Sequence, residues 1–394
     1  MICKMETVAF DTCEKGLLLL TGLFFLIQAF YYFFLYNRIY LHQKKADNGS
    51  LPFTNETHPV SVIIYAHDGT LSLRQNLTAI LNQDYPQFEV IVIKDGHNDE
   101  SEDYLTAMEE RHDNLYHSFV PDTSRYISRK KLAITLGIRA SKYEWIILTD
   151  ANCTPQSDQW LRLMARNFTS NTQIVLGYSG YEKEKGKLNR NISFDNLFTA
   201  MRYLGFALNG HPYMGIGRNL AYRKDLYYHQ KGFTAHLNLK RGEDDLFVNQ
   251  AATSENTRVE TDSQAAMRMP TAATSQEWKE EKIGYTATSH FYRGAQRWLC
   301  GAETATRLLF YTGWIASCIV GGLHGHWSVA GIALASFLLR LLLQAFVINK
   351  NADAVGEGRH YFFSLPLYDW LLPLQSFNRK LHFLFRHKEE FLRK

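Results

Sequence analysis

An uncharged apolar run of 21 residues, Gly16 to Tyr36, constrains this chain more than any other feature. The run is rich in Leu and Phe, and the polar residues Thr21 and Gln28 interrupt it. About 20 such residues in a helix span the hydrocarbon core of a bilayer. A secretory signal has a shorter apolar region followed by small residues, whereas this run ends in tyrosines and then basic residues. We therefore predict an uncleaved transmembrane helix.

Two further apolar stretches, Leu308–Gly322 and Ser328–Ile348, lie near the C-terminus on either side of the polar sequence His324-Gly325-His326. They predict two transmembrane or re-entrant helices within 306–350. The first stretch is short for a span and the second contains Arg340, so both arrangements stay open. Arg340 either extends to the lipid headgroups or contacts a lipid diphosphate.

Basic residues follow the first apolar run and return after the third. The positive-inside rule then predicts a multi-pass protein of the cell inner membrane whose large middle segment is cytoplasmic. Pro366 and Pro373 interrupt an aromatic stretch near the C-terminus, which predicts an interfacial amphipathic segment followed by a basic tail. The net charge of +4 is small and the basic residues lie near the membrane ends, so we expect no nucleic acid partner.

The middle segment alternates short β-branched runs with longer amphipathic ones. Such alternation predicts an α/β domain with a mostly parallel sheet, flanked here by the membrane helices. The expected strands are 60–65, 90–93 and 144–149, and the expected helices are 73–82, 100–110 and 131–140. The expected organisation is 1–15 N-terminal segment, 16–36 transmembrane helix, 37–57 linker, 58–300 cytoplasmic domain, 306–350 membrane helices and 351–394 interfacial segment and tail.

An acidic residue follows each of the three expected strands: Asp68, Asp95 and Asp150, the last with Asn152 two residues on. Each Asp alone fits a turn. Three strand ends of one kind favour a shared ligand, because ligands bind outside the carboxyl ends of strands in open α/β sheets. Such oxygens can accept hydrogen bonds from a nucleoside and hold a divalent cation. No glycine-rich dinucleotide or phosphate loop follows any of these strands.

Two later motifs allow more than one interpretation. Gly215 and Gly217 precede an apolar strand, and they predict either a close backbone approach to a bound sugar or a plain turn. Glu243, Asp244 and Asp245 precede an apolar helix start. They either cap that helix, or they act as crowded carboxylates of which one is a general base.

The ordered set of motifs, completed by Gln296-Arg297-Trp298, resembles membrane-bound family 2 glycosyltransferases of the bacterial inner-membrane type. The resemblance covers about residues 58–300 and implies a GT-A-type nucleotide-binding fold. It implies an inverting hexosyltransferase that moves a sugar from a nucleotide diphosphate sugar, a UDP-sugar by preference, to a membrane lipid, a lipid-linked acceptor or a growing glycan. The alternative is a noncatalytic GT-A-like membrane subunit of a polysaccharide assembly complex.

The resemblance also implies a role for each matching residue. Asp244 would be the catalytic base, with Asp245 as the alternative base and Glu243 as a further catalytic residue. The other implied groups are Asp68, Asp95, Asp150, Gly217 and Asn219 for the nucleotide sugar, Asp150 and Asn152 for Mg²⁺ or Mn²⁺, and Gln296, Arg297 and Trp298 for the acceptor side. Asn152 stands where the family often has an acid, and its amide oxygen brings no charge, so we expect weaker metal binding. In Gln296-Arg297-Trp298 the glutamine directly precedes the arginine, whereas polymerising members of the family have two residues between them. This difference does not favour processive polymerisation.

Overall fold

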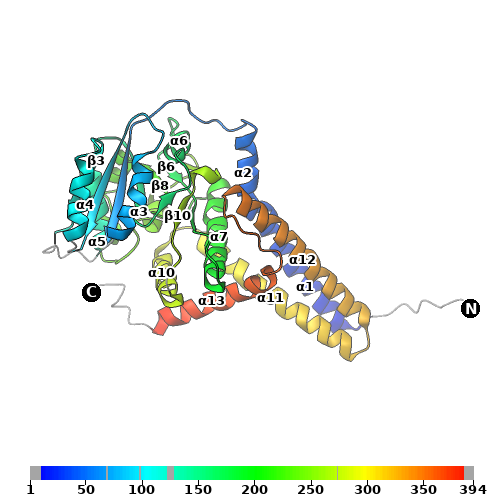
Figure 1. Cartoon of the computed structure of the whole chain (residues 1–394). Helices are drawn as coiled ribbons and strands as arrows, with labels where there is room; N and C mark the ends of the chain where they lie inside the picture. Colours follow the sequence, from blue (N-terminus) through cyan, green and yellow to red (C-terminus); the bar gives the residue numbers. More distant parts are fainter. Residues whose placement is uncertain (1–9, 68–69, 97–98, 122–127, 273, 386–394) are drawn as a thin grey trace, which may run out of the picture.

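Three long helices form one end of the molecule and an α/β domain forms the other (Figure 1). The computed structural model describes residues 10–67, 70–96, 99–121, 128–272 and 274–385. The C-terminal helix α13 (Leu365–Phe385) lies across the region where the two parts meet.

The domain is built on a mostly parallel sheet. Among the described residues it has seven strands in the order β3-β2-β1-β4-β8-β6-β9, and β8 runs antiparallel to both of its neighbours. The strands are β1 (Val60–His67), β2 (Phe88–Asp95), β3 (Leu115–Phe119), β4 (Trp145–Asp150), β6 (Ile174–Leu176), β8 (Leu220–Arg223) and β9 (Thr257–Val259). A small second sheet contains β5 (Thr154–Pro155), β10 (Met267–Met269) and β7 (Ser179–Tyr181). The predicted fold class is confirmed.

Helices cover both faces of the sheet, so the central strands read as unbroken apolar runs. Alternate residues of β1 enter different cores: Val62 and Ile64 pack on one side and Ile63 on the other. The helices of the domain are α3 (Thr70–Leu81), α4 (Asp99–Glu109), α5 (Arg129–Ala140), α6 (Trp160–Ala165), α7 (Lys187–Leu208), α8 (Lys224–His229), α9 (Asp245–Ala251) and α10 (Ser275–Thr288). The edge strand β3 was not predicted from the sequence, because Leu115 is its single buried residue.

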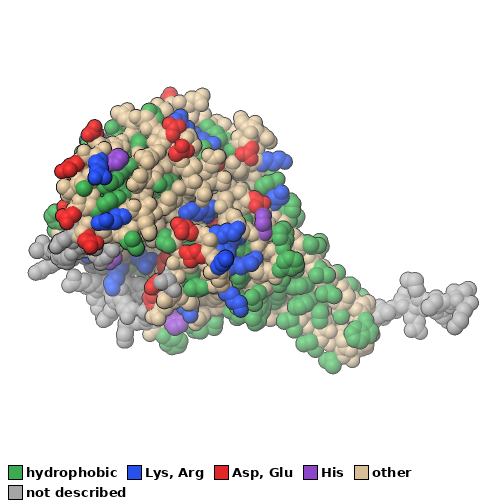
Figure 2. All heavy atoms as spheres, in the orientation of Figure 1, with side chains coloured by type: hydrophobic (Ala, Val, Ile, Leu, Met, Phe, Trp, Pro, Cys, Tyr) green, Lys and Arg blue, Asp and Glu red, His purple; other side chains and the backbone are tan. Residues whose placement is uncertain are grey.

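Three helical segments are long and apolar enough to cross a membrane by length and composition: Thr12–Asp47, Gln296–Leu323 and Trp327–Ala354. The last two are α11 and α12, of 28 residues each, and they form a helical hairpin. Apolar side chains cover the outside of this bundle (Figure 2), among them Leu26, Phe34, Ile319, Leu339 and Phe346.

The first apolar helix continues beyond the end that its composition suggested. Helix α1 (Thr12–Phe30) passes through a π-helical turn (Tyr31–Tyr36) into α2 (Arg38–Asp47). The prediction of a linker over 37–57 is therefore wrong for its first part. Asn351 of α12 explains the continuation: its amide donates to Tyr36 O at 2.8 Å and its Oδ1 accepts from Tyr40 N at 2.9 Å, so it satisfies the backbone groups that the π turn frees.

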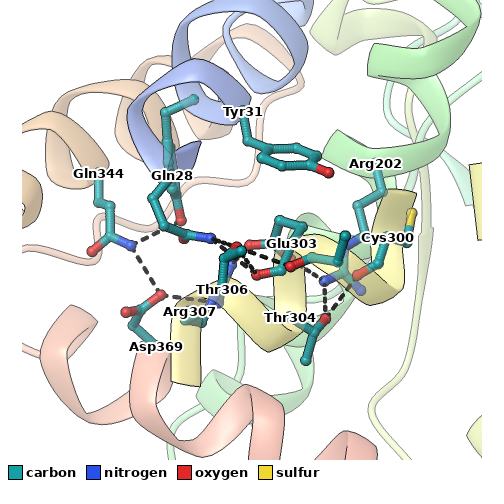
Figure 3. Close-up of polar contacts among 12 residues, drawn as sticks. Gln28, Tyr31, Arg202, Cys300, Glu303, Thr304, Thr306, Arg307, Gln344 and Asp369 are labelled. Carbon is teal, nitrogen blue, oxygen red and sulfur yellow. Dashed lines mark hydrogen bonds and ion pairs between the residues drawn. The ribbon is translucent and has the colours of Figure 1, made fainter. Parts of the chain in front are cut away.

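Charged residues tie the bundle to α7 and α13, and we call them the junction cluster: the buried Glu303, Arg307, Arg340 and Asp369 and the partly buried Arg202. Figure 3 labels all of them except Arg340. Asp369 pairs with Arg307 at 2.9 Å and with Arg340 at 2.7 Å, and Glu303 pairs with Arg202 at 2.5 Å and also with Arg307. Both sequence-based interpretations of Arg340 are therefore wrong. It neither extends to headgroups nor contacts lipid, because its partner is a carboxylate inside the protein.

Candidate active site

The ends of the parallel strands bring two of the predicted acidic residues to one edge of the sheet. Asp95 ends β2 and Asp150 ends β4, on either side of β1, whose Tyr65 is in register with Asp150. The Tyr65 hydroxyl donates to Asp95 at 2.8 Å, and Arg129 pairs with the same carboxylate. Asp68, predicted to hold the nucleotide, lies outside the described residues.

Asp150 is held by a lysine rather than by its own turn. The turn after β4 closes through a backbone hydrogen bond from Cys153 N to Asp150 O at 3.0 Å. Among the described contacts, the Asp150 carboxylate accepts from Lys130 Nζ at 2.6 Å, and both side chains stay partly exposed, at 22% and 26%. The Lys130 ammonium also lies 5.2 Å from the centre of the Tyr65 ring.

The carboxylates of the predicted base motif, Glu243 and Asp244, also act electrostatically on Lys130. Burial alone would lower the pKa of this lysine, but the carboxylates of Asp150, Glu243 and Asp244 outweigh burial and raise its pKa. The residue that contacts the strand-end acid is thus electrostatically coupled to the acids before α9. Hydrogen bonds connect the two groups as well: Thr149, next to Asp150, donates to Arg218 O at 3.1 Å, and the neighbouring Gly217 N donates to Asp244 at 2.9 Å.

Asp244 caps α9, and three donors fix its carboxylate. Oδ1 accepts from Asp245 N at 2.7 Å, while Oδ2 accepts from Gly217 N at 2.9 Å and from the Tyr285 hydroxyl at 3.0 Å. Asp244 is therefore a helix cap, as one of the two interpretations predicted, and its carboxylate is also oriented by a second loop. The N–H of Gly217, which was predicted to approach a sugar, donates to the predicted base.

The neighbours of Asp244 are buried acids with raised pKa values. Burial, aided by the charge of Asp244, raises the pKa of Asp245 to about 7, and the same two causes raise the pKa of Glu243. Asp245 accepts hydrogen bonds from Tyr292 at 2.7 Å and from Thr288. Glu243 Oε2 is buried without a hydrogen bond to another described residue. A group that titrates near neutrality in such a place is suited to proton transfer.

Lys131 positions the loop that leads into this motif. Its buried ammonium donates to the carbonyl oxygens of His236 at 2.6 Å, Leu239 at 2.8 Å and Arg241 at 2.8 Å. Burial lowers the pKa of Lys131 to about 8. Adjacent lysines of α5 therefore serve both parts of the site: Lys130 contacts Asp150, and Lys131 holds the loop before Glu243.

Asn219 does not face the site. It is 1% exposed, and its side chain accepts from Trp160 at 3.0 Å and donates to Tyr178 O and Ala265 O at 2.8 and 2.9 Å. These bonds join β8 to the small second sheet. We therefore assign it a structural role and exclude it from the proposed sugar-binding residues.

The three residues predicted for the acceptor side form the first turn of α11. Arg297 donates to His290 O at 3.2 Å and lies 5.7 Å from the centre of the Trp298 ring, which is 74% exposed. Gln296 Oε1 is buried with no hydrogen bond among the described residues. Tyr292, which precedes α11, donates a hydrogen bond to the Asp245 carboxylate.

Asp150 and Asn152 offer the oxygen donors that suit Mg²⁺ or Mn²⁺. The Asn152 side chain is exposed, and its Oδ1 lies 3.5 Å from Cys153 Sγ. The donor set thus fits a hard cation, with one carboxylate and one neutral amide. Lys130 already places a positive charge on the carboxylate, so the set carries less net negative charge than an acidic pair would.

Four side chains that build the site were not predicted from the sequence: Lys130, Tyr65, Tyr285 and Tyr292. Their hydrogen-bond partners lie between 20 and 47 residues away along the chain, so no local spacing marks them. For Lys130 a signal was present. Two adjacent lysines open an otherwise amphipathic helix directly before the strand that ends in Asp150.

Residues 61–230 match the family model described as Glycosyl transferase family 2. Two curated relatives, both named poly-beta-1,6-N-acetyl-D-glucosamine synthase and both from Staphylococcus epidermidis, are 24% and 22% identical over 141 and 142 residues. Each match covers 35% of this chain, which spans 31% of the length of each relative.

A mannosyltransferase from Pyrobaculum calidifontis, solved with GDP-mannose and Mn²⁺, has a similar fold. The TM-score is 0.54 at 15% identity, over 88% of this chain and 99% of that one. The fold is thus the GT-A-like one that the motifs implied. Residues 61–230 form a family 2 glycosyltransferase domain, which here is joined to helices of membrane-spanning length.

Proposed function

We propose that the protein transfers a hexose-type sugar, with inversion, from a nucleotide diphosphate sugar to a lipid-linked or growing glycan acceptor at the cytoplasmic face of the inner membrane. One observation carries this proposal: Lys130 contacts Asp150 at 2.6 Å and is coupled to Glu243 and Asp244. A donor diphosphate and an acceptor base would then share one site. The family 2 domain and the long apolar helices support the same assignment.

In the proposed reaction Asp244 removes the proton from an acceptor hydroxyl. The oxygen attacks the anomeric carbon from the face opposite the diphosphate, the bond to the diphosphate oxygen breaks, and that electron pair leaves on the diphosphate. The bonds from Gly217 and Tyr285 fix the direction of the base. Asp95, together with Asp68, which directly follows β1 in the sequence, would bind the nucleoside, and Lys130 would face the diphosphate.

Asp150 and Asn152 would hold Mg²⁺ or Mn²⁺, which stabilises negative charge on a leaving diphosphate when bound. The ammonium of Lys130 supplies positive charge at the same place. We therefore propose that the metal strengthens catalysis and that the lysine carries part of this electrostatic role without it.

The experiment is a donor screen with the purified full-length protein in lipid, beginning with UDP-N-acetylglucosamine because of the names of the curated relatives. We expect Asp244→Asn to lower turnover by about 10²–10⁴-fold, the usual contribution of a general base, while UDP binding persists. Asp262→Asn is the matched control, because Asp262 also caps a helix but lies outside the site. Equal turnover in the wild type and Asp244→Asn would refute the assigned base.

A noncatalytic subunit is the second candidate, and the Asn152 amide favours it, because a neutral amide in place of an acid reduces the negative charge available to bind a metal. Calorimetric titration with UDP, with and without Mn²⁺, distinguishes the candidates. Binding under either condition supports the transferase, whereas no binding under both supports the subunit.

A further inference from the structure

A second group of potential ligands lies at the end of the helix bundle that is far from the domain (Figure 1). Glu14 in the first turn of α1 faces the turn between α11 and α12, which contains His324 and His326. The side-chain ligand atoms of these residues all lie within 4.8 Å of one another. None of the three takes part in the site described above.

We propose that Glu14, His324 and His326 bind a divalent transition-metal ion of the zinc class. His326 Nδ1 lies 2.8 Å from Glu14 Oε1 and 2.9 Å from Oε2, and His324 Nδ1 lies 3.1 Å from Oε1. Adjacent ligands of a tetrahedral Zn²⁺ stand about 3.3 Å apart, given Zn–N and Zn–O bonds of about 2.0–2.1 Å. The distances from Glu14 Oε1 to the two histidine nitrogens, 2.8 and 3.1 Å, are therefore shorter than this spacing by about 0.5 Å or less.

The charge balance of the group also points to a cation. Glu14 is 0% exposed, and among the described residues its ion-pair partners are the two histidines. No lysine or arginine among the described residues forms an ion pair with this buried carboxylate. The N–H of Asp11 donates to Oε2 at 2.9 Å as part of the helix cap, and it adds a partial charge only.

The turn between the two histidines is shaped to present both rings to one carboxylate. Gly325 has a φ of +70°, a conformation that L side chains rarely adopt, and this reversal places residues 324 and 326 on the same side. Glu14 is brought there because α1 packs tightly on α11, where Thr21 leaves no room for a side chain at Gly313. Three protein ligands leave a fourth position for water, and the histidines, 46% and 33% exposed, keep it accessible.

The ion would join the start of α1 to the α11–α12 hairpin. In the proposed orientation this end of the bundle faces away from the cytoplasm, so the ion would come from the outside. The proposal is independent of the sugar-transfer activity, because the two sites share no residue.

The test is a Zn²⁺ titration of chelator-treated full-length protein, carrying no polyhistidine tag, in lipid nanodiscs. We expect one Zn²⁺ per chain, a rise in melting temperature with Zn²⁺, and a tetrahedral d–d spectrum with Co²⁺. Glu14→Gln, His324→Gln and His326→Gln should each weaken binding about 100-fold or more, because even the loss of an outer-shell partner costs about 10–100-fold.

His360→Gln is the matched control, since His360 lies 3.7 Å from Asp353 at the other end of α12. It should bind Zn²⁺ as the wild type does. The proposal is overturned if the wild type binds no Zn²⁺, or if the three variants bind it as tightly as the wild type. A lower melting temperature of Glu14→Gln without any Zn²⁺ response in the wild type would show a hydrogen-bonded clamp instead, which also overturns it.

Discussion

The protein buries charge in two places and does so in opposite ways. In the junction cluster, Glu303 and Asp369 are each paired with arginines at 2.9 Å or less. In the acidic triplet of residues 243–245, like charges lie next to one another. The two lysines whose charges act on these acids have other contacts: Lys130 contacts Asp150, and Lys131 contacts backbone carbonyl oxygens. Both regions are buried, so solvent does not account for the difference.

The contrast separates a structural use of charge from a chemical one. Opposite charges in good geometry offset the cost of leaving water, and they fix how helices from distant parts of the chain meet. Like charges raise the pKa of a neighbour instead, which destabilises the fold but produces a group that exchanges protons near neutrality. Asp245, with its pKa raised to about 7, is the result in the second region.

The largest effect is expected when a pair in the junction cluster is broken. Asp369→Asn removes the carboxylate that faces Arg307 and Arg340 and should destabilise the protein by about 3–5 kcal/mol, because it leaves a buried charge without compensation. Thermal unfolding in detergent measures this. Asp353→Asn, at an exposed position of α12, is the control.

A second substitution makes this test of the junction cluster sharper. Adding Arg340→Met to Asp369→Asn removes the uncompensated cation, and it should restore part of the stability. If Asp369→Asn melts like the wild type, the cluster does not hold the helices together and the contrast with the acidic triplet fails.

The crowding of acids in the acidic triplet should make the stability of the folded protein depend on pH. The pKa of Asp245 in the folded state, about 7, lies above its unfolded value, so the folded state binds the extra proton between about pH 4 and pH 7. Stability from this group is present at low pH and is lost as the pH rises through that window. Asp245→Asn should therefore gain stability relative to the wild type as pH rises, by an amount on the order of a few kcal/mol.

Melting temperatures of the wild type and Asp245→Asn between pH 4 and pH 8 give this difference. Asp103→Asn, at an exposed position of α4, should follow the wild type across the range. A constant offset between Asp245→Asn and the wild type would mean that Asp245 is charged throughout, and the crowding argument would fail.

The sequence allowed the frame of the site to be predicted but not its internal partners. Strand ends could be located because buried parallel strands are continuous apolar runs, and Asp95 and Asp150 then share an edge by topology alone. The Lys130–Asp150 contact depends on how α5 packs on the sheet, and Arg340–Asp369 joins different helices. Local sequence patterns do not predict contacts of this kind. The same limit applies to α2, whose continuation depends on Asn351 about 300 residues away.

A substitution of Lys130 tests whether nucleotide binding at the acidic site depends on this lysine. Lys130→Met removes the partner of Asp150 and should weaken UDP binding about 10–100-fold, since a charge-assisted contact to phosphate is worth about 1.5–3 kcal/mol. Binding of UDP with and without Mn²⁺ is the measurement. Lys142→Met, at an exposed position near the end of the same helix, is the control. UDP affinity unchanged by Lys130→Met would show that the lysine serves Asp150 alone.

The smallest effect is expected at Asn152, where the protein has a neutral amide in place of a second carboxylate beside Asp150. Asn152→Asp would place a second carboxylate two residues from Asp150 and extend the crowding of the acidic triplet toward the diphosphate side. A divalent cation relieves such crowding, so Mn²⁺ affinity should rise about tenfold, or about 1.4 kcal/mol. Mn²⁺ titration monitored by electron spin resonance measures this, with Asn171→Asp, an exposed asparagine, as the control. If Mn²⁺ affinity stays the same while Lys130 remains in place, the lysine has taken the position of the metal, and Asp150 belongs to a paired site like those of the junction cluster.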